Sequence, residues 1–359
     1  METNPVYFYV NSIGPDGLFS VNAHCAQDTN ETRVYLVRGG VSESGKFIED
    51  VALSLEKEGL FSQRFLSFYA NATDGAYFPD IDVYIFDANT NFFKPSMIDC
   101  THYTVDLGSC ADKRMLFHNR FLISDAMEKE KNFLAKSVKF FSAVKSAKED
   151  IERLSAEAVN AEKVERFVSR FVKRELGSLS AFSGKEYLRI LTPPTADGIF
   201  FPENTLVKMC PKLYCIDDRT GAVSGLLISQ IRESALLCGF DVISLLTPFS
   251  QKAEHLFIPE IGLGIITSDD FHRYTGDCFK RISYTRFVES EKIKKHKSRI
   301  KFNVDAKKEL LTQGCYLMGE AKKCREEYLE VYSRSYNREK IKSLADDTAR
   351  EIKSFINYT

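Results

Sequence analysis

The sequence has no tryptophan, and none of its nine cysteines belongs to a CxxC pair. Zinc and redox sites use clustered cysteine and histidine spacings, so their absence argues against both, and the scattered cysteines are typical of reduced cytoplasmic thiols. Net charge is also nearly absent, at −1, so no overall field directs the chain toward nucleic acid or an anionic membrane. No apolar run approaches the roughly 20 residues that cross a bilayer, and residues 1–5 lack a signal-peptide pattern. We therefore expect a cytoplasmic protein with neither nucleic acid nor membrane as partner.

The chain instead contains the same pattern twice. Its 359 residues, 44% hydrophobic and 28% charged, are typical of globular proteins. Three landmarks recur at offsets of 177 to 181 residues: Asp16-Gly17-Leu18-Phe19 with Asp197-Gly198-Ile199-Phe200, Phe78-Pro79-Asp80-Ile81 with Ile258-Pro259-Glu260-Ile261, and Asn160-Ala161-Glu162-Lys163-Val164 with Asn337-Arg338-Glu339-Lys340-Ile341. A repeat of this length indicates two homologous domains, which we place at 1–180 and 181–359.

Each repeat begins with the same series of predicted elements. A strand, a polar loop and a helix come first, and two further strands follow: 34–37, 47–58, 64–68 and 83–86 in the first copy, and 213–216, 226–238, 241–245 and 263–266 in the second. Gly59 and Gly239 stand where a helix C-cap belongs. Strands that alternate with a helix favour an α/β fold with a parallel sheet in each domain.

Each repeat ends in a predicted helical arm, over about 122–176 and 305–357. Apolar residues follow a heptad spacing over 140–161 and again over 317–331. Because these seams are short and rich in alanine, we expect an antiparallel helical hairpin within each domain. Asn160 and Asn337 are the expected N-caps of the second helix of each hairpin, and the domain boundary is expected within 177–184.

The loop after the first strand carries the strongest motif. Residues 40–46 match G-x-x-x-x-G-K between a strand and a helix, the context in which backbone amides and a lysine hold phosphates. The candidate phosphate loop consists of Gly39, Gly40, Ser44, Gly45 and Lys46. The next position, usually a magnesium-binding Ser or Thr, is Phe47, which cannot ligate a metal.

The second copy of this loop departs further from the motif. It has no lysine, and Asp217 and Asp218 would repel a phosphate. Asp87, at the end of the strand 83–86, fits a Walker B carboxylate that holds magnesium through water, although a solvated carboxylate is the commoner role. The corresponding residue of the second copy is Thr267, and the nearby Asp269 and Asp270 fit a turn cap.

These landmarks together resemble a bacterial family of uncharacterised function with two tandem P-loop ATPase-like domains. The resemblance covers nearly the whole chain and also includes Gly239-Phe240-Asp241-Val242. It implies two P-loop NTPase-type folds that bind ATP and magnesium, with Asp87 as the Walker B aspartate and a family histidine at His272, to which no role is assigned. Family members carry G-x-x-G-x-G-K-[ST] in each half, and this chain departs from that pattern in both.

Three functions remain open from the sequence. The favoured one is a degenerate, non-hydrolysing scaffold or regulatory protein that acts through a protein partner or self-association. The alternative is an ATP-binding protein or weak ATPase that uses the first copy only, with Lys46 on the phosphates and Asp87 on magnesium. A nucleic-acid binder using the basic stretch 292–301 is less favoured, because Glu289 and Glu291 beside it indicate a solvated, ion-paired face.

Overall fold

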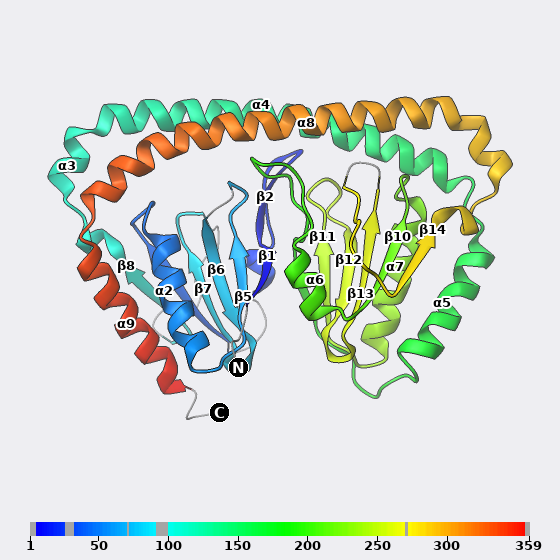
Figure 1. Cartoon of the computed structure of the whole chain (residues 1–359), viewed down its shortest axis with the longest axis horizontal. Helices are drawn as coiled ribbons and strands as arrows, with labels where there is room; N and C mark the ends of the chain where they lie inside the picture. Colours follow the sequence, from blue (N-terminus) through cyan, green and yellow to red (C-terminus); the bar gives the residue numbers. More distant parts are fainter. Residues whose placement is uncertain (1–4, 26–31, 70–71, 91–99, 270–271, 356–359) are drawn as a thin grey trace.

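The structure is a computed structural model that describes residues 5–25, 32–69, 72–90, 100–269 and 272–355. The first half of the chain forms one six-stranded sheet of order β1-β5-β6-β7-β4-β8, and the second half forms another of order β14-β10-β13-β12-β11-β9. The second order, read backward, places each strand beside the same neighbours as its counterpart in the first (Figure 1). The first sheet comprises β1 (Val6–Tyr9), β4 (Arg33–Arg38), β5 (Gln63–Leu66), β6 (Thr73–Phe78), β7 (Val83–Asp87) and β8 (His102–Asp106). The second comprises β9 (Glu186–Arg189), β10 (Lys212–Asp217), β11 (Val242–Leu246), β12 (Ala253–Ile258), β13 (Leu263–Ser268) and β14 (Lys280–Ser283).

The expected α/β fold class is confirmed, but the sheets are mixed rather than parallel. β6 runs antiparallel to β5 and β7, and β12 runs antiparallel to β11 and β13. Direct connections of a few residues join these strands, including the 3-10 turns η1 (Pro79–Ile81) and η3 (Pro259–Ile261). A parallel neighbour needs a crossover of a dozen or more residues, so connections this short produce antiparallel pairs.

The helix after the first loop is present in both halves. It is α2 (Ser44–Lys57) in the first and α7 (Ala222–Leu237) in the second. Gly59 and Gly239 follow these helices with φ of 94° and 87°, a left-handed conformation that confirms the predicted C-caps. The remaining short elements are β2 (Asn11–Gly14), β3 (Gly17–Ser20), α1 (Asn22–Cys25), α3 (Lys113–His118), α6 (Glu203–Met209), η2 (Leu107–Cys110) and η4 (Tyr284–Phe287).

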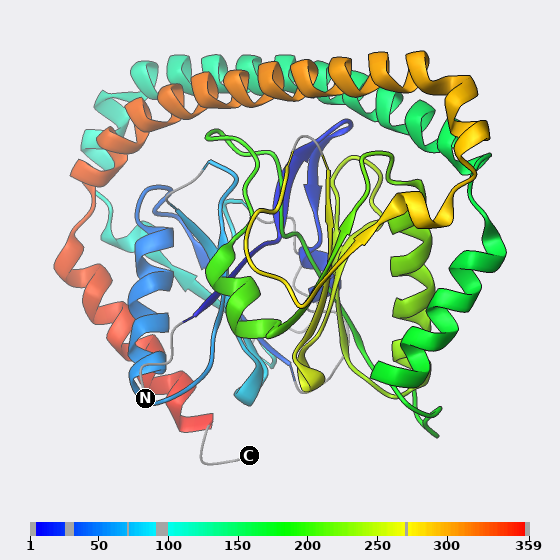
Figure 2. The same cartoon turned by 45° about the vertical axis from the view of Figure 1, so that its right-hand side comes forward.

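Four longer helices form an arch over and beside the two sheets. The helices α4 (Arg120–Ala156) and α8 (Ser290–Ser335) lie side by side and antiparallel as a roof, while α5 (Ala161–Glu175) and α9 (Arg338–Ser354) descend at its two ends (Figures 1 and 2). The side chains of Asn160 and Asn337 accept hydrogen bonds from Lys163 N–H and Lys340 N–H, which confirms both predicted N-caps.

The expectation of a hairpin within each half is wrong, because the arms are exchanged. α4 pairs with α8 of the other half, the apolar face of α5 packs on α7, and that of α9 packs on α2. A helix of 37 residues spans about 55 Å, so α4 carries the chain across to the second sheet before α5 begins. Each sheet layer is therefore completed by a helix from the opposite half.

The halves also share a core where the two sheets meet. Val6 and Phe8 of β1 belong to the same buried cluster as Ile243 and Phe257. Arg189 of β9 is fully buried there, and its guanidinium donates to Gln63 Oε1 and Tyr84 Oη, both at 3.2 Å. Burial of a charge costs free energy unless it is hydrogen-bonded, so these contacts are what make Arg189 compatible with the interface.

A close approach of α4 to α8 at Gly314 predicts a sharp difference between two glycines of α8. A Cβ on Gly314 would lie 2.3 Å from Phe141 of α4, whereas a Cβ on Gly319 would have only Ala196 O, at 3.5 Å. We expect Gly314→Ala to destabilise the fold by about 1–3 kcal/mol through overpacking, and Gly319→Ala to stabilise it by about 0.5–1 kcal/mol through helix propensity. Denaturant unfolding of both variants measures the difference, and equal effects would contradict the close crossing.

Candidate functional site

The predicted phosphate loop of the first half connects β4 to α2. Gly39 and Gly40 have φ of 71° and 59°, which only glycine adopts without strain. They also lie against η2, because a Cβ on Gly39 would be 2.8 Å from Gly108 N and one on Gly40 would be 2.9 Å from Leu107 Cδ1. Gly40 N–H donates to the Tyr336 hydroxyl at 2.8 Å. Loop geometry and packing therefore account for both glycines.

Lys46 lies on the first turn of α2 and is largely solvated. Its side chain is 57% exposed, and Nζ is 3.4 Å from the carboxylate of Glu43, which is buried beneath the loop. Phe47 is fully buried in the core, so no metal ligand follows the lysine. A Cβ on Gly45 would lie 3.0 Å from Thr73 O, so this glycine allows α2 to approach β6.

The fold brings two of the predicted residues into direct contact. Ser44 Oγ donates to Asp87 Oδ2 at 2.8 Å, and Asp87 Oδ1 accepts from Asn89 N–H at 2.8 Å. Burial raises the pKa of Asp87, partly offset by these hydrogen bonds. Asp74 of β6 is an additional member, since burial raises its pKa to about 7 against a hydrogen bond from Asn11, and the charge of Asp87 adds to that rise. The charge of Asp87 thus disfavours ionisation of Asp74.

The corresponding loop of the second half is filled by its own carboxylate. Asp218 is 1% exposed, and its Oδ2 accepts from Val223 N–H at 3.0 Å and Ser224 N–H at 2.9 Å. Its Oδ1 accepts from the amide and the hydroxyl of Thr220, at 2.9 and 2.6 Å. The amides that a phosphate would use at the start of α7 are therefore already bound to an anion. The sequence analysis expected Asp217 and Asp218 to repel a phosphate; in the fold, the Asp218 carboxylate itself occupies these amides.

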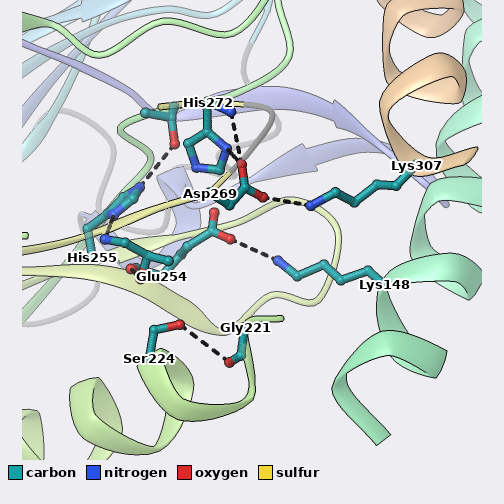
Figure 3. Close-up of polar contacts among 10 residues, drawn as sticks. Lys148, Gly221, Ser224, Glu254, His255, Asp269, His272 and Lys307 are labelled. Atoms are coloured by element: carbon teal, nitrogen blue, oxygen red, sulfur yellow. Dashed lines mark hydrogen bonds and ion pairs between the residues drawn. The ribbon is translucent and has the colours of Figure 1, made fainter. Parts of the chain in front are cut away.

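A group of buried charges lies at the ends of β12 and β13 in the second sheet, where the roof helices meet the sheet (Figure 3). Lys148 of α4 donates to Glu254 at 2.9 Å, and Lys307 of α8 donates to Asp269 at 2.6 Å. Asp269 also pairs with His272 Nδ1 at 3.0 Å. Both roof helices are thus tied to the second sheet by ion pairs whose side chains are no more than 17% exposed.

The electrostatics of this group follow from its pairings. Burial alone would raise the pKa of Glu254, but Lys148 outweighs it and the pKa falls to about 2. Burial alone would lower the pKa of His272, but the Asp269 carboxylate outweighs it and raises the pKa. For His255 burial dominates and lowers the pKa to about 3, so this imidazole stays neutral.

Three of these side chains, Glu254, His255 and His272, have ligand atoms within 4.8 Å of one another, a spacing that a metal ion could use. His255 does not suit that role, because its Nδ1 accepts from Thr267 N–H at 3.0 Å and its Nε2, which must then carry the proton, lies 3.1 Å from Thr192 Oγ1. A cation would also meet the ammonium groups of Lys148 and Lys307. We conclude that this group is built for charge pairing and not for a metal.

One polar atom of this group has no hydrogen bond within the part of the chain that the structure describes. His272 Nε2 is buried and has no hydrogen-bond partner among the described residues. The His272 residue lines a cavity of about 30 Å³, which is the volume of one water molecule, together with Lys148, Glu254 and Lys307. A single water there would satisfy the ring nitrogen and link the two ion pairs.

Between α4, α7 and the β11–β12 turn lies an open groove of about 840 Å³. Its charged lining is balanced, with Lys148, Arg153, Arg232 and Lys252 facing Glu149, Glu152, Glu186 and Glu254. Arg232 is already bound by both carboxylate oxygens of Glu186, at 2.8 and 2.7 Å. The groove therefore offers no excess of either charge.

The sequence did not predict this buried charge group. Asp269 was expected to cap a turn, and it does accept from His272 N–H at 2.9 Å, but its second oxygen binds Lys307 from a helix 38 residues later. Asp270 lies outside the described residues. The one available signal was the internal repeat, because Glu254 occupies in β12 the place of Asp74 in β6.

Comparisons with known proteins supply no relative. No family model, no curated protein and no solved structure matches the chain. None of the helices within the described residues is long and apolar enough to cross a membrane.

Proposed function

We propose that the chain consists of two tandem P-loop NTPase-like domains, 1–180 and 181–359, that act as a scaffold or regulatory protein and do not hydrolyse nucleotide. The observation that carries this proposal is Asp218, whose carboxylate occupies the amides of the second loop. Thr267 replaces the aspartate that would hold magnesium in that half, and Phe47 replaces the magnesium-binding hydroxyl in the first. Both halves thus lack a group that hydrolysis needs.

The exchanged arms support a scaffolding role. α5 packs on α7 and α9 packs on α2, so the helical layer of each half is completed by a helix from the other half. The buried ion pairs of Lys148 and Lys307 fix the roof to the second sheet. A body held in this way presents fixed surfaces to a protein partner or to a second copy of the chain.

A second candidate function is ATP binding by the first loop alone. It is favoured by the bond of Ser44 Oγ to Asp87, because a hydroxyl at the loop and a carboxylate at the neighbouring strand end are the pair that would share magnesium. In addition, α2 has no side-chain cap, whereas Asp218 caps α7. Lys46 would meet the phosphates and Asp87 the metal.

Calorimetric titration with ATP and with ADP, each with and without magnesium, separates the two functions. For the scaffold we expect no heat of binding and no thermal stabilisation at millimolar nucleotide, together with no magnesium-dependent phosphate release. Lys46→Ala should then behave as the wild type does.

The matched control is Lys57→Ala, an exposed lysine at the opposite end of α2. Binding that Lys46→Ala abolishes and Lys57→Ala leaves intact would replace the scaffold with the ATP-binding function. Magnesium-dependent turnover would reject the non-hydrolysing proposal altogether.

A further inference from the structure

α3 meets α4 at one end of the roof (Figure 1). The side chains at this corner are basic and apolar. A shallow hollow of about 410 Å³ there is lined by Lys113, Arg114, Phe117, His118 and Arg120. None of these lining side chains is acidic. The hollow therefore presents cationic groups around an aromatic ring.

The same corner exposes large apolar side chains. Phe117 is 67% exposed, Phe121 73% and Leu122 50%. The Arg120 guanidinium lies 4.3 Å from the ring centroid of Phe117 and 4.2 Å from that of Phe121, so cation and rings form one surface. Exposed apolar groups of this size that adjoin one another mark an interaction site.

The first turns of α8 provide a related surface at the opposite end of the roof (Figure 1). Lys292 and Lys294 pair with Glu289 and Glu291, which confirms the predicted ion-paired face for those two lysines. Phe302, further along the same helix, is 70% exposed. Arg299 is bound by both carboxylate oxygens of Asp150 of α4, at 2.7 and 2.9 Å. The other basic side chains there are the exposed Lys295, Lys297 and Lys301.

The overall charge of −1 conceals a strong separation. The roof helices α4 and α8 hold 20 basic and 13 acidic side chains, and the rest of the chain holds 29 basic and 37 acidic ones. The roof thus carries +7 and the remainder −8. Lys148 and Lys307 use two of these positive charges in ion pairs with the second sheet, so the exposed excess on the roof is smaller. The positive charge that the overall sum conceals is therefore a local property of the roof.

We propose that the α3–α4 corner, assisted by the first turns of α8, docks the protein on an anionic lipid bilayer. Cations at the surface attract acidic headgroups, and exposed Phe and Leu side chains enter the headgroup boundary. Aliphatic Leu122 and the neighbouring Met127, which is 40% exposed, distinguish this surface from a nucleic-acid site, since bases stack on rings and gain little from aliphatic chains. This docking does not depend on either loop binding nucleotide.

Co-sedimentation with vesicles tests the proposal directly. The probes are vesicles of phosphatidylcholine with about one third phosphatidylserine and vesicles of phosphatidylcholine alone, at a fixed salt concentration. We expect sedimentation with the anionic vesicles only. Lys113→Gln/Arg114→Gln/Arg120→Gln should weaken it roughly a hundredfold, at about fivefold per cation, and Phe117→Ser/Phe121→Ser roughly tenfold or more.

The matched control removes three exposed lysines outside the roof, with Lys57→Gln/Lys163→Gln/Lys173→Gln. It changes the net charge equally and should retain vesicle binding. Circular dichroism and thermal unfolding confirm that each variant folds, which the exposure of all the substituted side chains favours.

Three outcomes would overturn the proposal. They are equal binding to neutral vesicles, no binding to either vesicle, and equal loss in the control and corner variants. Retention of single-stranded or duplex DNA at the same salt concentration, without vesicle binding, would reassign the corner to nucleic acid. Because no nucleotide is present, the result is independent of the loop titrations.

Discussion

Replacing Ile352 with alanine in the last helix is expected to loosen α2 and the sheet it covers, although α2 ends almost 300 residues earlier in the sequence. Ile352 is fully buried in the cluster that contains Phe47, Ile48 and Val51 of α2. Removal of its side chain leaves a cavity that costs about 2–5 kcal/mol. Hydrogen exchange measured by mass spectrometry should show faster exchange in α2 and β4, with α7 unchanged.

The matched variant is Phe171→Ala, in the helix of the first half that packs on the second. Phe171 is 1% exposed, and its ring centroid lies 5.1 Å from that of Tyr214 in β10. We expect its replacement by alanine to lower the free energy of unfolding by about 3–5 kcal/mol. Exchange should rise in α7 and β10 and not in α2. If each variant instead loosened its own half, the arms would form hairpins within the halves, and the exchanged architecture would be wrong.

Two buried groups are expected to give stability opposite dependences on pH. His255 has a folded pKa of about 3, below its ordinary 6.5, so it contributes stability above 6.5 that is lost as the pH falls toward 3. Asp74 has a folded pKa of about 7, above its ordinary 3.8, so its contribution is complete at acid pH and is lost as the pH rises through 7. Each effect amounts to about 1.4 kcal/mol per pH unit within its window.

The measurement is the free energy of unfolding of wild type, His255→Asn and Asp74→Asn between pH 5 and 6.5. Asparagine retains an acceptor for Thr267 N–H in one variant and for Asn11 in the other. The stability of wild type relative to His255→Asn should decrease as the pH falls, by about 2 kcal/mol over the interval. Relative to Asp74→Asn it should increase by a similar amount.

The two variants serve as controls for each other. A general effect of acid on the denatured chain is common to wild type and variant and cancels in each difference. The two stability differences could instead change with pH in the same direction, or not change at all. Either result would show that these side chains titrate in the folded state much as they do in the unfolded chain.

Local features of the fold could be predicted because neighbouring residues decide them. Gly59 and Gly239 end their helices in the left-handed conformation, and Asn160 and Asn337 cap theirs, since each of these contacts spans only a few residues. The strands at 34–37 and 83–86 are present as β4 and β7. The duplication allowed each half to support the assignment in the other.

The candidate site could be predicted only in part. Ser44 and Asp87 were named separately, as members of a loop and of a strand end, and their hydrogen bond depends on the parallel pairing of β4 with β7. The group of Lys148, Glu254, Asp269, His272 and Lys307 was missed, because two helices and one sheet edge assemble it over 160 residues of sequence. No local spacing records such a group.

The sequence by itself determined the α/β class, the C-caps at Gly59 and Gly239 and the N-caps at Asn160 and Asn337. Those properties depend on periodicity, on capping and on the chemistry of a few adjacent side chains. Only the tertiary structure decided which helices pair, because an apolar seam does not specify its partner helix. The pairing of α4 with α8 and of α5 with α7 depends on shape and distance. It also decided where charge lies, since a net charge of −1 describes a sum, and folding separates a basic roof from an acidic body.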